Sequence, residues 1–398
     1  MSQKLFFRAD QVGSLLRPPE LLKARSDFEN GLITAQALRL AEDQAIAKTA
    51  QLQEACGFEV VVDGEFRREN WWIDFVRGLS GVEIQDGKVE QAFIAPADQV
   101  QAQAQAQAPA KAQAHVHEED CDHDHEWKYV PKNVLTTGKL SLPQAITVHD
   151  YQHLQSVTQK TAKVTIPSPT RLHFHGGRDA VSKKAYPDID AFFEDVTRVY
   201  REEISALERA GCRYIQIDDP LMTYFISDRM REEVRAAGDD PEQRLDQYIQ
   251  LTNACIAERL PTTTIGIHVC RGNSKSGWIA EGGYERIAEK VFTGLKVDHF
   301  LLEYDDARSG DFEPLRFMPK EVKLVLGLVT TKFGRLEDKG ELKRRIEDAS
   351  RFVDLSRLGL SPQCGFASTV EGNIITHEDQ WKKLQLVTEL AREVWGEN

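Results

Sequence analysis

Residues 264–273 read TIGIHVCRGN and give the clearest indication of the fold class. Its first part is rich in β-branched residues, which favour a strand, and a histidine and a cysteine separated by one residue follow near the expected strand end. Alternate residues of a strand point to the same face, so we expect His268 and Cys270 to face the same way. A buried strand that ends in polar residues and leads into a helix is typical of parallel α/β folds.

The same pattern recurs along the whole chain. We predict eight strands, namely the segment before Gly13-Ser14 and residues 58–62, 163–166, 214–217, 263–269, 297–302, 323–328 and 357–360. Amphipathic runs predict helices at residues 189–210, 241–259, 283–295, 339–355 and 377–395. This alternation predicts an α/β protein with a single (β/α)8 TIM barrel over residues 1–398.

A long gap between the second and third predicted strands interrupts this rhythm. Residues 99–114 are almost pure Gln-Ala alternation, and residues 115–126 read HVHEEDCDHDHE. Low complexity of this kind predicts a disordered insert at residues 99–126, within the barrel domain. The histidines and acids could collect metal ions, but nothing there fixes a geometry, so an unstructured acidic loop is the favoured interpretation.

The acidic composition of the chain argues against two classes of binding partner. The chain has 50 basic and 63 acidic residues, a net charge of −13, which disfavours nucleic acid and anionic membrane surfaces as partners. We find no signal peptide and no apolar run of membrane-spanning length, and we expect a cytoplasmic protein. Six cysteines in such a chain indicate metal binding, catalysis or burial rather than a disulfide framework. A homo-oligomer is compatible with the sequence.

The polar residues after the strands carry the chemistry, because barrel active sites lie at the carboxyl ends of the strands. Glu303 ends the sixth predicted strand and Cys364 follows the eighth, so both are expected to converge with His268 and Cys270. Two thiolates, an imidazole and a carboxylate suit Zn²⁺. Two cysteinates would offset the charge of the ion, which then favours holding a substrate thiolate over activating water. We therefore predict alkylation of a bound thiol.

Six segments together resemble the catalytic half of cobalamin-independent methionine synthase, in a single-barrel form. They are VGSLLRP (12–18), VVDGEFRREN (61–70), YIQIDDP (214–220), IGIHVCRGN (265–273), LLEYDD (301–306) and SPQCGFAS (361–368). The resemblance implies that His268, Cys270, Glu303 and Cys364 bind zinc. It also implies that Glu65 and Asp218 hold the ammonium group of homocysteine, and that Gly13-Ser14 holds its carboxylate.

The sequence departs from the family at three places. The full-length enzymes carry an additional N-terminal barrel, whereas this sequence starts at the catalytic one. Residues 165–170, TIPSPT, offer no aromatic where the family places a tryptophan against the pteridine. Lys332 stands near the position of the family's proton-donating histidine, and either a proton donor or an anchor for an anionic group is expected there.

Four further residues are candidates for the methyl-donor site. Trp71 and Trp72 could present a flat surface to a donor ring or could pack the loop against the barrel rim. Arg67 and Arg68 could hold an anionic donor or could pair with nearby acids.

The leading hypothesis is methyl transfer to homocysteine to give methionine. The donor is expected to be 5-methyltetrahydrofolate, its polyglutamate or a simpler methyl donor. A competing hypothesis is a zinc enzyme that adds the thiol of coenzyme M to an epoxide, which would leave Glu65 and Asp218 without an ammonium group to bind. A zinc storage or delivery protein and a metal-free decarboxylase of the uroporphyrinogen type are two more hypotheses.

Overall fold

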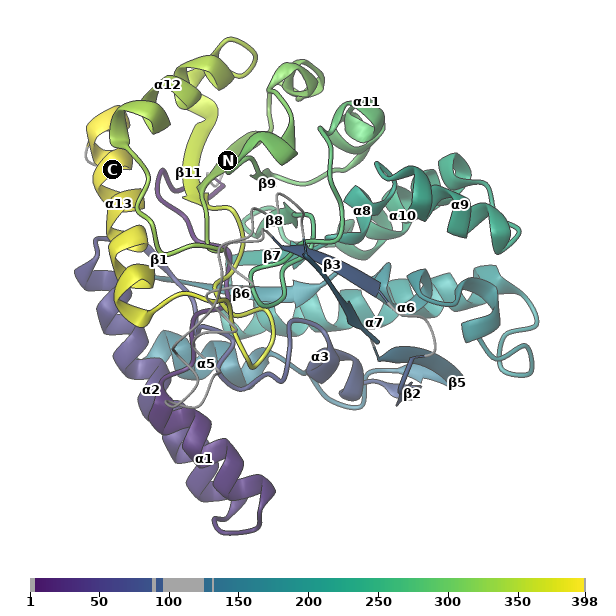
Figure 1. The fold of residues 1–398 in the computed structure, drawn as a ribbon. Coiled ribbons are helices and arrows are strands. Elements are labelled where there is room, and N and C mark those ends of the chain that lie inside the picture. Colours follow the sequence, from purple (N-terminus) through teal and green to yellow (C-terminus); the bar gives the residue numbers. More distant parts are fainter. Residues whose placement is uncertain (1–3, 88–90, 96–124, 131, 397–398) are drawn as a thin grey trace, which may run out of the picture.

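The computed structural model describes residues 4–87, 91–95, 125–130 and 132–396. Its centre is a curled parallel sheet surrounded by helices, the arrangement of a TIM barrel (Figure 1). Along the sheet, neighbouring strands follow the order β1, β6, β7, β8, β9, β10, β11. Their bounds are Val60–Val61, Thr161–Pro167, Tyr214–Asp218, Thr264–Val269, His299–Glu303, Lys323–Val329 and Leu358–Pro362, respectively.

The eighth position of the barrel is taken by residues 8–10 rather than by a full strand. Ala9 forms an isolated parallel bridge with Leu360 of β11. The Leu360 amide donates to the Arg8 carbonyl over 2.8 Å, and the Asp10 amide donates to the Leu360 carbonyl over 2.9 Å. The predicted first strand is therefore a short paired segment that lies against the last strand.

The helices form the outer layer of the barrel. Helix α7 shows why its sequence is helical: Asp188 caps its first turn, Gly211 ends it in a left-handed conformation, and its apolar face is buried. The helices of the described chain are α1 Pro19–Glu29, α2 Ala35–Ala55, α3 Ile73–Arg77, α5 Val148–Ser156, α6 Arg171–Phe174, α7 Ile189–Ala210, α8 Leu221–Tyr224, α9 Asp228–Ala236, α10 Pro241–Ile256, α11 Glu285–Gly294, α12 Lys339–Ser350 and α13 His377–Trp395. None of them is long and apolar enough to cross a membrane.

The excursion between β1 and β6 contains two antiparallel strand pairs. Strand β2 (Ser80–Gln85) pairs with β5 (Asn133–Ser141), and β3 (Gln91–Ala95) pairs with β4 (His125–Tyr129). The β3–β4 hairpin is tied to the barrel by Ile94, whose amide and carbonyl bond to Trp278 in the loop after β8. The predicted insert at residues 99–126 overlaps β4 at residues 125 and 126, and residues 99–124 lie outside the described residues.

Polar side chains fill much of the barrel interior. On β7, Tyr214, Gln216 and Asp218 alternate with Ile215 and Ile217, so the three polar residues share one face of the strand. Gly266 of β8 leaves room for the Tyr214 ring, because a Cβ there would lie 3.3 Å from it. The interior thus presents hydrogen-bonding groups beneath the carboxyl ends of the strands.

Candidate active site

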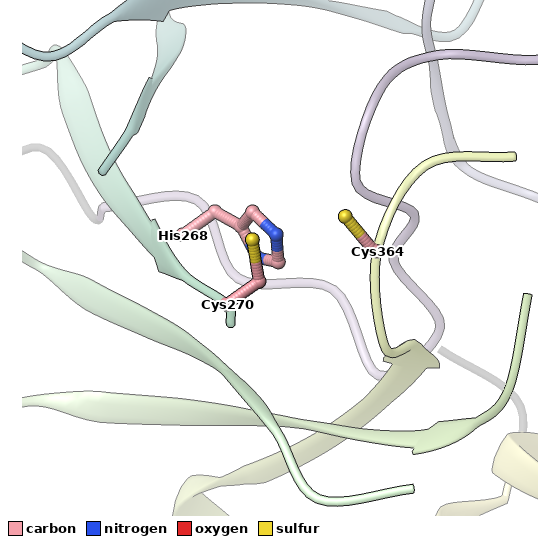
Figure 2. Close-up of side chains that lie close together, drawn as sticks. All are labelled: His268, Cys270 and Cys364. Atoms are coloured by element: carbon pink, nitrogen blue, oxygen red, sulfur yellow. The ribbon is translucent and has the colours of Figure 1, made fainter. Parts of the chain in front are cut away.

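Three of the four predicted metal ligands lie together at the carboxyl end of the barrel. The ligand atoms of His268, Cys270 and Cys364 are within 4.8 Å of one another, and all three residues are buried. Figure 2 shows His268 and Cys270 side by side at the end of β8, with Cys364 facing them from the loop after β11.

The chemistry of this cluster fits a zinc ion. Among the described residues, the buried His268 ring has no hydrogen-bond partner outside the cluster, so the imidazole is available as a ligand. The Cys270 thiol and the neighbouring His268 hold the pKa of Cys364 well below its usual range, which favours a thiolate. An imidazole and two sulfurs at one point are a ligand set that zinc prefers.

Glu303, the fourth predicted ligand, lies beside this cluster but outside the group of three. It ends β9 and is fully buried. One carboxylate oxygen accepts from the Arg271 amide over 2.8 Å, and the other pairs with the Arg308 guanidinium at 3.2 Å. Burial opposes its ionisation, but the charges of Arg308 and Lys332 outweigh burial and lower the pKa of Glu303. Its carboxylate is therefore held charged next to the cluster.

Two buried acids, Glu65 and Asp218, line the same cavity as the cluster. Glu65 accepts a hydrogen bond from the Thr165 hydroxyl over 2.9 Å and pairs with Arg68 at 3.5 Å. Burial raises the pKa of Glu65; burial and then the charge of Glu65 raise the pKa of Asp218 to about 7. Two buried acids that repel each other form a favourable site for a cation.

Ser14 lines the same cavity as these acids, at a point where two loops pack closely. Its carbonyl accepts from the Phe366 amide over 2.8 Å, and its hydroxyl accepts from the Ala367 amide over 3.3 Å. A Cβ on Gly365 would lie 1.9 Å from the Ser14 hydroxyl oxygen, and one on Gly13 would lie 2.8 Å from a Glu65 carboxylate oxygen. Only glycine permits these approaches, which join the Cys364 loop to the Ser14 loop.

Aromatic side chains form the other wall of the cavity. Trp71 and Trp72 both line it, and the Arg171 guanidinium stacks on the Trp72 ring at 3.8 Å. Phe93 reaches the cavity from the β3–β4 hairpin and packs in a small apolar cluster with Tyr224. The cavity has a volume of about 100 Å³.

Two residues of this cavity, Arg171 and Phe93, are not among those predicted from the sequence. Arg171 comes directly after TIPSPT, so the rule that barrel sites lie after strand ends was a signal that could have identified it. Phe93 reaches the cavity only because its hairpin folds back onto the loop after β8, and no local sequence signal predicts that contact.

Two other candidates lie outside the cavity lining. Arg67 is turned toward the outer helices, where it pairs with Glu42, Asp43 and Asp150. Lys332 is fully buried behind the loop after β8, and its ammonium donates to the Asn273 side chain over 3.3 Å and to the Gly277 carbonyl over 3.4 Å. Of these two, only Lys332 is linked to the cavity, through Asn273.

Comparison with known proteins gives one consistent result. The family described as cobalamin-independent synthase, catalytic domain, matches residues 123–384. Two uncharacterized proteins of Bacillus subtilis (strain 168), YxjH and YxjG, are 42% and 41% identical to this chain. These alignments cover 99% and 98% of it and 96% and 95% of their own lengths.

Solved structures show the same similarity. A Listeria monocytogenes protein, provisionally named a vitamin B12-independent methionine synthase, has a TM-score of 0.73 at 33% identity, with 100% of both chains covered. A B12-independent methionine synthase from Shewanella sp. W3-18-1, solved in complex with selenomethionine, has a TM-score of 0.67 at 19% identity, with 98% of both chains covered; at that identity the likeness concerns the fold.

Proposed function

Because the chain belongs to the family of cobalamin-independent synthase catalytic domains, we propose that it is a zinc-dependent methyltransferase that converts homocysteine to methionine. The observation that carries this proposal is the convergence of His268, Cys270 and Cys364 on one point of a cavity that also contains two buried acids. We propose 5-methyltetrahydrofolate, its polyglutamate or a simpler methyl donor as the source of the methyl group.

The three clustered residues would hold the zinc ion, with Glu303 as the fourth and exchangeable ligand. When bound, zinc would keep the substrate thiol deprotonated and nucleophilic near neutral pH. Arg271 and Arg308 already bind the Glu303 carboxylate, so they can retain it when a substrate sulfur is present. Lys332 contributes through its charge, which lowers the pKa values of both Glu303 and Cys364.

The remaining polar groups would bind the amino-acid part of homocysteine. Glu65 and Asp218 would accept the ammonium group, and the Ser14 hydroxyl with the neighbouring backbone would bind the carboxylate. The thiol then points toward the cysteines, and the aromatic wall of Trp71 and Trp72 faces the methyl donor. The substrate sulfur forms a new bond to the methyl carbon. The bond between this carbon and the donor breaks, and its electron pair leaves with the donor.

The test is a screen of thiols and methyl donors with the full chain loaded with zinc. We expect methylation of homocysteine, detected as methionine by mass, and one zinc per chain that is lost in Cys364→Ser. Cys212→Ser is the matched control, because Cys212 is a buried thiol away from the cavity. Alkylation of coenzyme M without any reaction of homocysteine would reject the proposal in favour of the epoxide-type enzyme.

A second experiment separates an enzyme from a zinc carrier. Removing residues 99–124 should leave both the bound zinc and the turnover unchanged, because the three clustered ligands belong to the barrel. Loss of most of the bound zinc on this deletion would instead support storage or delivery.

A further inference from the structure

Gln216 lies in the middle of β7, fully buried one step below Asp218. Its side-chain amide nitrogen donates two hydrogen bonds, one to an Asp218 carboxylate oxygen and one to the Val12 carbonyl, both over 2.7 Å. Val12 directly precedes Gly13-Ser14. One side chain therefore connects the proposed ammonium site to the segment that carries the proposed carboxylate site.

The orientation of this amide is fixed from below by Lys163. The buried Lys163 ammonium donates to the Gln216 side-chain oxygen over 3.0 Å. An ammonium group has donors and no acceptor, so the amide oxygen must face Lys163 and the amide nitrogen must face Asp218. A reversed amide would place two donors against each other and two acceptors against each other.

Lys163 is itself held in place by the N-terminal segment. It pairs with the Asp10 carboxylate at 2.7 Å and also donates to the Gln11 carbonyl. The second Asp10 oxygen accepts from the Tyr214 hydroxyl over 2.6 Å. Buried polar networks of this kind are rigid when each member is satisfied, because breaking one bond leaves a buried group unpaired.

We propose that Gln216 is a positioning residue that sets Asp218 and the Val12–Ser14 segment at the separation required by an α-amino acid. The proposal rests on the proposed function, because it assumes that these two groups bind the ammonium and the carboxylate of homocysteine. It predicts that Gln216 determines selectivity for thiols that carry both charged groups and contributes nothing to the binding of a thiol that lacks both.

The experiment compares two ligands by titration calorimetry on the zinc-loaded full chain. Homocysteine carries both charged groups, whereas propane-1-thiol has the same thiol without either. Gln216→Met keeps the shape of the side chain but removes the amide. We expect its dissociation constant for homocysteine to rise at least tenfold, with that for propane-1-thiol changed less than about twofold. General damage to the barrel would weaken the binding of both ligands to the same extent.

Two further variants keep the test decisive. Gln216→Glu retains an acceptor for Lys163 but has no N–H group for Asp218, so it should lose homocysteine binding even if the methionine variant does not fold. Tyr248→Phe is the control, because it removes a buried hydrogen bond to His173 outside the cavity and should bind both ligands as the wild type does.

A double-mutant cycle tests whether Gln216 acts through Asp218. Asp218→Asn alone should weaken homocysteine binding, and Gln216→Met should add clearly less in that background than in the wild type. Full additivity would overturn the positioning role.

The outcomes also separate this inference from the proposed function. If the wild type binds propane-1-thiol but not homocysteine, the proposed function fails and the inference falls with it. If the wild type binds homocysteine and both Gln216 variants bind it equally well, only the inference fails. The inference is also overturned if both Gln216 variants lose binding of homocysteine and of propane-1-thiol to the same extent while Tyr248→Phe binds both normally.

Discussion

Single residues decide whether the two halves of the candidate site fit together. Gly365 follows Cys364 and precedes the residues that hydrogen-bond to Ser14. The Ser14 hydroxyl occupies the space that a side chain at position 365 would fill. The parts of the site proposed to bind the thiol and the amino-acid group are therefore one packed unit rather than two independent patches.

Gly365→Ala should separate these parts. The added methyl group would overlap the Ser14 hydroxyl, so we expect at least tenfold weaker homocysteine binding and a loss of roughly 1–3 kcal/mol in the free energy of unfolding. Calorimetry and urea denaturation would measure these two quantities. Gly138→Ala is the matched control, because its Cβ would meet its nearest neighbour at 3.5 Å, an ordinary contact. Unchanged homocysteine binding in Gly365→Ala would contradict the close packing.

His299 gives a prediction about pH. Burial lowers its pKa to about 4, from 6.5 in the unfolded chain, so the unfolded state binds the proton more readily. The contribution of His299 to the free energy of unfolding is fully present above pH 6.5. It is lost as the pH falls through about 4, and the loss amounts to at most about 3 kcal/mol. His299→Gln should therefore lose less stability than the wild type between pH 7 and 4, as measured by urea denaturation.

The exposed His149 provides the control for that experiment. His149→Gln should retain the pH dependence of the wild type, which also contains contributions from other buried histidines such as His173. Identical slopes for the wild type and His299→Gln would rule out the assignment to His299.

At the scale of elements, the sequence predicts the regular barrel well and the excursion poorly. Helices α7 and α13 begin and end at the predicted residues, because their amphipathic patterns are bounded by capping residues. The four strands of the excursion were missed. Their antiparallel pairing joins segments far apart in the chain, and such contacts depend on tertiary packing.

The candidate site shows the same division. The trio of His268, Cys270 and Cys364 could be predicted because the ends of barrel strands converge whatever the loops do. Ion pairing sets the positions of the other candidates. Glu303 is held beside the trio by Arg308, and Arg67 is held away from the cavity by acids such as Asp43. The partners of Arg67 come from distant segments, and Arg308 is one of several charged residues in the loop after Glu303, so neither pairing carries a local sequence signal.

The hairpin β3–β4 contributes Phe93 to the cavity, and its attachment depends on the backbone of Ile94. Ile94→Pro removes the N–H group that donates to Trp278, at a cost of about 1 kcal/mol or more. We expect faster proteolysis within the hairpin and a KM for the methyl donor raised about fivefold. Ile94→Ala keeps the N–H group and should behave much like the wild type. Equal proteolysis of both variants would show that the bridge does not hold the hairpin.

At the scale of the whole molecule, we expect the barrel to hold the proposed metal ligands in place without depending on the ion. His268 lies on β8, Cys270 directly follows it and Cys364 follows β11, and both strands belong to a continuous buried core. Removing zinc with a chelator should leave the circular dichroism spectrum unchanged. The free energy of unfolding of the apoprotein should be about 3–4 kcal/mol lower than that of the holoprotein, if the holoprotein is measured at a free zinc concentration of about a hundred to a thousand times the dissociation constant for zinc. Loss of secondary structure on chelation would contradict this expectation.

The pairing of residues 8–10 with Leu360 has a consequence for biosynthesis. Residues 8–10 precede every strand of the sheet along the chain and are made before them, whereas their partner β11 is the last strand of the sheet to be made. Until β11 arrives, the growing sheet retains open edges, which are sites of mispairing with other chains. Cys364 follows β11, so the cluster of His268, Cys270 and Cys364 can form only after this last strand of the sheet has been made.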